Sequence, residues 1–161
     1  MTNRNRRKLA LCLIGVLLLY FVSLLWIDLY PFNDLEAAED YYGDQYLATQ
    51  LGGTLFSVIV LLLGSYLVYM TKKRALIWVG FLLFLVLLLL QLTASWLPYI
   101  SGASTESLSL HQRLFGETVT ILPGIKDHPV PDLAHTILGL LYLLITIGAG
   151  LYLIKTKNRS V

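Results

Sequence analysis

Four long apolar segments divide the chain, and each is close to the length that crosses a lipid bilayer. They cover about residues 9–29, 46–70, 75–97 and 133–154. A helix needs about 20 apolar residues to cross roughly 30 Å of hydrocarbon at about 1.5 Å per residue. The segments are continuous and rich in leucine, without the alternation of a membrane-barrel strand. The pattern therefore predicts an all-α protein, a four-span transmembrane helical bundle that forms a single integral membrane domain over residues 1–161.

The first polar segment between spans, residues 30–45, has the composition of a short helix. Asn33 or Asp34 can cap its start, and Gly43 can end it. Between these positions lie good helix formers, residues 35–39. One or two helical turns lying at the membrane interface are expected here.

The second polar segment, residues 98–132, is the longest stretch outside the spans, and loops of this length commonly carry function or structure of their own. Ser104 or Thr105 can cap a helix that runs to about Phe115, and Gly116 can end it. Its apolar side chains recur at helical spacing and fall on one face. We expect a second interfacial helix whose apolar face lies on lipid headgroups or roofs the bundle.

Charge placement predicts the orientation of the spans. Ten of the 12 Lys and Arg residues lie before the first span, between the second and third, or after the fourth, and the exceptions are Arg113 and Lys126. The positive-inside rule places these basic flanks and both termini in the cytoplasm. All 10 acidic residues fall on the opposite side, which gives that face a net charge of about −8. We expect a multi-pass protein of a plasma membrane, and we prefer a bacterial inner membrane.

Composition and the lack of known motifs argue against several classes of function. Hydrophobic residues make up 57% of the chain and charged residues 14%, with a mean hydropathy of +0.70. The single cysteine, Cys12, excludes an internal disulfide and a CxxC redox pair. The sequence has no nucleophile elbow, HExxH, Walker loop or GxGxxG, so it indicates no enzyme class. The basic clusters are short and match orientation signals, so the expected partners are membrane lipids and other membrane subunits or a second copy, not nucleic acid.

Polar residues within the spans gather toward the acidic side, whereas the other halves of the spans are nearly all apolar. One interpretation is an outward-facing polar pocket closed below by an apolar plug, because polar groups in lipid face one another or a wet cavity. The alternative is that these groups only hydrogen-bond between helices or, for the acid near the end of span one, snorkel to the interface. The residues assigned to this pocket are Asp28, Gln50, Thr54, Gln91, Thr93 and His135.

A metal site is a second candidate on the same side. Asp132 and His135 are spaced i, i+3 at the start of the fourth span and so share a face. Imidazole and carboxylate are ligands for transition metals, and His128 and His111 could complete the set. Asp132 has an alternative use as a helix cap that orients His135. His135 could also hydrogen-bond a quinone or a lipid headgroup in the outer pocket.

These patterns leave three functional hypotheses. The first is a non-enzymatic accessory or interaction subunit that acts through helix packing and its acidic outer loops. The alternative is an outward-facing metal-, quinone- or lipid-binding subunit of a redox or transport complex that uses Asp132 and His135. The third is a small transporter whose pathway forms only on oligomerisation.

Overall fold

The chain folds into helices, as the hydrophobic pattern predicts. In the computed structural model, which describes residues 3–157, four segments are long and apolar enough to cross a membrane. Short helices fill much of the polar segments. The elements in chain order are α1 (Asn3–Trp26), α2 (Leu35–Tyr42), the 3-10 turn η1 (Gly43–Gln45), α3 (Tyr46–Tyr69), α4 (Arg74–Gln91), the π-helix η2 (Leu92–Trp96), α5 (Leu97–Ser101), α6 (Thr105–Phe115) and α7 (Leu133–Lys157).

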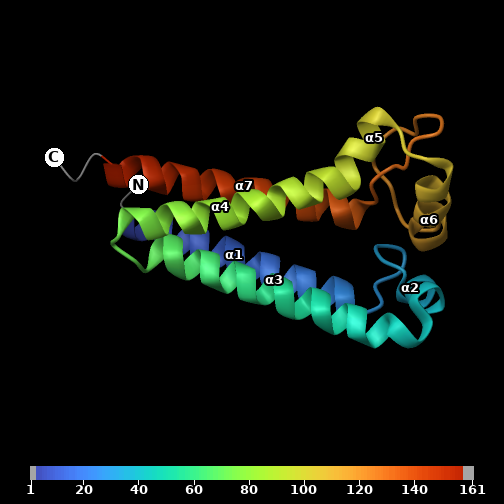
Figure 1. Ribbon diagram of the computed structural model, residues 1–161, viewed down its shortest axis with the longest axis horizontal. Helices are drawn as coiled ribbons and strands as arrows, with labels where there is room; N and C mark the ends of the chain where they lie inside the picture. The colour runs from blue at the N-terminus through green and yellow to red at the C-terminus, as the bar shows by residue number, and fades with distance from the viewer. Residues whose placement is uncertain (1–2, 158–161) are drawn as a thin grey trace.

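The four long helices form an up-and-down bundle in which every neighbouring pair is antiparallel. Around the bundle the order is α1, α3, α4 and α7, and α7 closes the ring against α1. One end of the bundle holds the α3–α4 turn, the N-terminal end of α1 and the C-terminal end of α7. We call it the basic end because the Lys and Arg clusters flank it. The opposite end holds α2 and α6, which pack against each other and which we call the roof (Figure 1).

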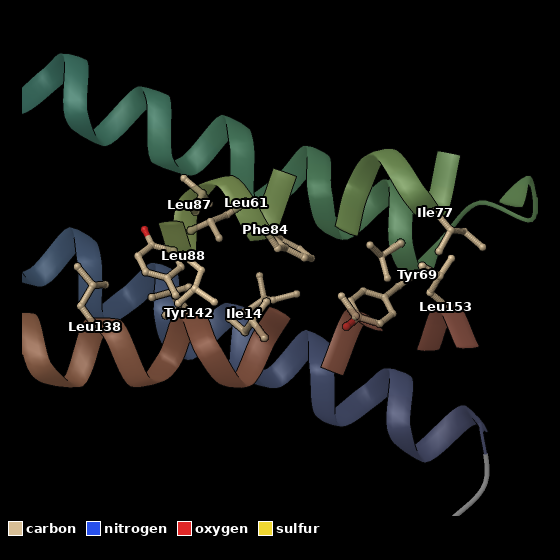
Figure 2. Packing of buried hydrophobic residues seen from close by; sticks show 14 residues of the cluster. Ile14, Leu61, Tyr69, Ile77, Phe84, Leu87, Leu88, Leu138, Tyr142 and Leu153 are labelled. Atoms are coloured by element: carbon tan, nitrogen blue, oxygen red, sulfur yellow. The ribbon is translucent and has the colours of Figure 1, made fainter. Parts of the chain in front are cut away.

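The core of the bundle is apolar and tightly packed toward the basic end. Leu17, Leu61 and Phe84 are almost fully buried, and side chains from α3 and α4 face those from α1 and α7 (Figure 2). At Gly80 an added Cβ would come within 2.9 Å of the Gly64 carbonyl oxygen, so the backbones of α3 and α4 nearly touch there. Toward the roof the α1–α3 pair and the α4–α7 pair spread apart (Figure 1).

Both short helices predicted in the polar segments are present, with the expected caps. The Asp34 carboxylate accepts a hydrogen bond from the Ala37 backbone N–H at 2.9 Å, and Gly43 ends α2 with a φ of 51°. That left-handed conformation favours glycine because it has no Cβ. The Ser104 hydroxyl accepts from the Ser107 N–H at 3.2 Å and caps α6. Local capping chemistry thus sets where the roof helices begin.

The third long segment differs from the expected simple span. It was predicted to end near residue 97, but the helix continues through the π-helix Leu92–Trp96 to Ser101. Pro98 has no N–H, and in a regular α-helix its ring would crowd the carbonyl of Ala94, four residues earlier. A wider π turn is a common way to absorb such a break, and it lies directly before this proline.

The first long helix ends at Trp26, before the expected boundary at residue 29. The Asn33 side-chain amide donates to the carbonyl oxygens of Leu24 at 2.7 Å and Ile27 at 2.9 Å. These bonds satisfy carbonyl groups that have no partner where a helix stops. The chain then turns back toward the bundle and enters the roof.

Candidate functional site

The site begins where the second polar segment returns to the bundle. The backbone N–H of Val119 donates to the Pro31 carbonyl at 2.9 Å, and the N–H of Leu133 donates to the Val119 carbonyl at 2.7 Å. An isolated antiparallel bridge also pairs Thr120 with Asp132. These contacts join the two polar segments and fix Asp132 at the start of α7, where only 2% of it is exposed.

Asp132 holds His135 through two kinds of hydrogen bond. One carboxylate oxygen accepts from the His135 backbone N–H at 2.6 Å, which caps α7. The carboxylate also lies 2.9 Å and 3.0 Å from Nδ1 of the same imidazole. Nδ1–H therefore donates to the carboxylate, and within residues 3–157 the structure shows no partner for Nε2. The carboxylate thus fixes the tautomer and leaves Nε2 for another group.

The ring of Phe115 in α6 packs against two histidine rings, that of His111 in the same helix and that of His135 in α7. Its ring centre lies 5.0 Å from that of His135 and 5.2 Å from that of His111. Nε2 of His111 lies 2.9 Å from the Val130 carbonyl oxygen and, as N–H, donates to it. Burial lowers the pKa of His111 below its ordinary value of 6.5, although the Val130 carbonyl and the Asp132 charge act in the opposite direction. Burial therefore disfavours the charged form of His111.

A cavity of about 300 Å³ lies below the roof and between α1, α3 and α7. Its walls are mostly apolar and include side chains of α1, α2, α3, α6 and α7. The groups that bear on its chemistry are Phe21, Asp34, Tyr42, Gln50, Phe115, Asp132 and His135. A second cavity of about 280 Å³ adjoins it, shares Tyr42, Phe115, Asp132 and His135, and adds Gln91, Ser95 and His111. The Asp132–His135 pair forms part of the wall of both.

Three of the six residues assigned to the outer polar pocket line these cavities. His135 lines both, Gln50 lines the first and Gln91 the second. Both amides also connect helices. Gln50 donates to the Leu25 carbonyl of α1 at 2.9 Å, and Gln91 donates to the His135 carbonyl of α7 at 3.2 Å. Part of the polar cluster therefore bonds helices together, and part faces the cavities.

The other three residues lie outside the described cavity walls. Thr54 accepts a hydrogen bond at 2.9 Å from the indole N–H of Trp26, which joins α3 to the end of α1. Asp28 is exposed and accepts from a backbone N–H two residues further along the chain. Thr93 is exposed and donates to a carbonyl four residues earlier on its own helix.

Of the four predicted metal ligands, only Asp132 and His135 contact each other directly. His111 uses Nε2 on the Val130 carbonyl, and Nδ1 of His128 lies 2.7 Å from the carbonyl oxygen of Tyr99. Among residues 3–157, no group of three or more His, Cys, Asp or Glu side chains is arranged to hold a metal ion. The described geometry is that of an oriented histidine.

Several cavity residues were not singled out by the sequence as part of a site. Asp34 was expected only to cap the first short helix, and Phe115 only to lie near the end of the second one. Phe21 and Tyr42 were not singled out. Their helical spacing shows which side of one helix is apolar, but not which other helix that side meets. Chemically, the assembled wall can accept a ligand hydrogen bond at His135 and surround an apolar group. No protein-family model, curated protein or solved structure matches this chain with significance.

Proposed function

We propose that this protein crosses a plasma membrane four times, with the basic end in the cytoplasm and the roof outside. Two features support the orientation. The Lys and Arg clusters flank one end of the bundle, and the acidic residues gather at the other. The large apolar side chains exposed along the four long helices also favour a lipid surround. We prefer a bacterial inner membrane.

We further propose that its function is to bind an amphiphilic molecule, with an apolar body and one polar end, in the cavity under the roof. The observation that carries this proposal is the buried Asp132 carboxylate that orients His135 on an otherwise mostly apolar wall. Sites for small molecules are typically about 300–1,000 Å³, largely apolar and equipped with a few placed polar groups. At about 300 Å³ the cavity is at the small end of this range, so it suits a head group better than a whole lipid.

Helix capping alone does not require this arrangement. Serine or asparagine at position 132 would cap α7 about as well as aspartate, without the cost of burying a charge. What the carboxylate adds is the contact with Nδ1 of His135, a residue of the cavity wall whose Nε2 has no partner among residues 3–157. The apolar body of a ligand bound there would lie against the side chains of α1, α3 and α7 that line the cavity.

Two adjacent glycines of α3 provide the test. Gly53 lines the cavity and Gly52 does not, and a Cβ at either position would meet no atom within 4 Å. Gly53→Phe should therefore fill the cavity without straining the helix, and Gly52→Phe should be its matched control. The wild type and both variants would be extracted from membranes with their surrounding lipid, and bound molecules identified by native mass spectrometry.

We expect one amphiphile to remain with the wild type and Gly52→Phe and to be lost from Gly53→Phe, at equal thermal stability. If all three proteins carry the same molecules in the same amounts, the cavity is not a binding site. The accessory-subunit hypothesis, in which the cavity is only a packing void, would then be the better account.

A further inference from the structure

The charges and rings around the cavity favour one kind of polar end. Two carboxylates, Asp34 and Asp132, and three aromatic rings, Phe21, Tyr42 and Phe115, line it. No Lys or Arg is among the described residues of either cavity wall. A phosphate or carboxylate head would meet like charges and no cation. A positive head would meet carboxylates and the electron-rich faces of aromatic rings, which attract cations.

We propose that the roofed cavity selects an amphiphile whose polar end is a protonated amine. This inference rests on the proposed function and adds the chemical class of the ligand. The ammonium group lies at Nε2 of His135, on the opposite side of the ring from the Asp132 carboxylate, and in the field of Asp34. Its apolar body lies against the ring of Phe115 and the leucines of α1 and α7. An anionic lipid headgroup and an uncharged quinone are the ligands that this chemistry disfavours.

His135 gives the site a reason to prefer an amine that carries an N–H. In the neutral imidazole whose Nδ1–H donates to Asp132, Nε2 bears the lone pair and can accept a hydrogen bond. An ammonium N–H is a strong donor to such a nitrogen. The carboxylate behind the ring stabilises the partial positive charge that the imidazole gains in that bond.

The charge of the whole roof end acts in the same direction. It carries all 10 acidic residues and only two basic ones. One of the two, Arg113, lies over the Tyr41 ring at 5.3 Å and donates to the Asp40 carbonyl, and it lines neither of the two cavities. An acidic surface attracts cations from solution and raises their concentration near the site.

Three probes of nearly the same shape but different charge test the proposal. N,N-dimethylbenzylammonium carries N–H⁺ where isobutylbenzene carries C–H, and phenylmethanesulfonate supplies the matching anion. Binding would be measured by calorimetry on the full-length protein in lipid nanodiscs at low salt. Gly53→Phe in the same nanodiscs corrects for partition into the bilayer, because it fills the cavity and leaves the lipid unchanged.

Two variants separate the local charge from the general field of the roof. Asp34→Asn keeps a side chain that caps α2 but removes a carboxylate from the cavity wall. Asp40→Asn removes one charge from the same helix at an exposed position outside both cavity walls. We expect the cation to bind on the order of tenfold more tightly than isobutylbenzene, and Asp34→Asn to weaken it about three- to tenfold. Asp40→Asn should change it by less than about twofold.

The outcomes distinguish this inference from the proposed function. Equal or tighter binding of isobutylbenzene or phenylmethanesulfonate overturns the choice of an amine, as does an equal effect of Asp34→Asn and Asp40→Asn. If Gly53→Phe nevertheless loses the amphiphile that co-purifies with the wild type, the proposed binding function holds and the ligand has a different polar head group. If none of the three probes binds and Gly53→Phe releases nothing, both proposals fail.

Discussion

Replacing Asp132 tests how much the site contributes to the stability of the fold. The residue is 2% exposed and makes a capping bond of 2.6 Å to the His135 N–H and a contact of 2.9 Å to Nδ1 of the same residue. Asp132→Asn keeps an oxygen for the cap and loses only the charged bond to the imidazole. Asp132→Ala loses both. The two variants therefore separate capping from orientation of the histidine.

The magnitudes follow from the two bonds. A hydrogen bond to a charged group contributes about 1.5–3 kcal/mol, although the His135 side chain is 35% exposed and solvent screening places the value near the lower limit. Loss of a cap costs about 0.5–2 kcal/mol. Asp132→Asn should therefore lower the free energy of unfolding by about 1.5 kcal/mol, and Asp132→Ala by about 2–4 kcal/mol.

The assay is equilibrium unfolding in mixed micelles, with a denaturing detergent as the titrant. Asp127→Asn is the matched control, because Asp127 is exposed, lies in the same segment and has a φ of 62° that asparagine also tolerates. It should change the free energy of unfolding by less than about 0.5 kcal/mol. If Asp132→Asn is as harmless as Asp127→Asn, the carboxylate does not hold the histidine and the site loses its basis.

Three further outcomes are expected. Gly80→Ala should destabilise the bundle by about 1–3 kcal/mol, because its Cβ would press on the Gly64 backbone. Gly52→Ala, with no atom within 4 Å, should be neutral or stabilising by up to about 1 kcal/mol in the same unfolding titration. The free energy of unfolding should fall as pH drops below 6.5, because the lowered pKa of His111 means that the unfolded chain binds a proton at a higher pH than the folded one. In unfolding titrations between about pH 7 and 5, His111→Gln should reduce this dependence of stability on pH. Trp26→Phe should lower the free energy of unfolding by about 0.5–1.5 kcal/mol, because it removes the hydrogen bond from the indole N–H to the Thr54 hydroxyl of α3. Thermal melting can measure this loss.

Much of the fold could be predicted from local sequence signals. The apolar segments give the long helices, because only a helix satisfies the backbone over such a length in lipid. Asp34, Gly43 and Ser104 mark helix ends through contacts within a few residues, and the structure confirms all three. The π-helix before Pro98 was missed, since a proline at the end of an apolar segment predicts that the helix stops there and not that it continues through a wider turn.

The site was only partly predictable, because it depends on contacts between distant segments. The i, i+3 spacing placed Asp132 and His135 on one face, and they do contact each other. The position of His128, and that of the Val130 carbonyl that pairs with His111, depend on the path of residues 116–132, which contacts such as Val119 to Pro31 determine. No local pattern encodes such a pairing. The cavity has the same origin, since it exists only where the roof meets the spreading helix pairs.

Imidazole NMR tests the central claim most directly, because the chain has only three histidines. The protein would be labelled with nitrogen-15 in its histidine rings, and each signal assigned by a single His→Gln substitution. Addition of N,N-dimethylbenzylammonium should shift the Nε2 signal of His135 and leave His128 unchanged, since the latter bonds to Tyr99 and does not line the cavity. A shift at His128 alone, or no shift at His135, would contradict binding under the roof.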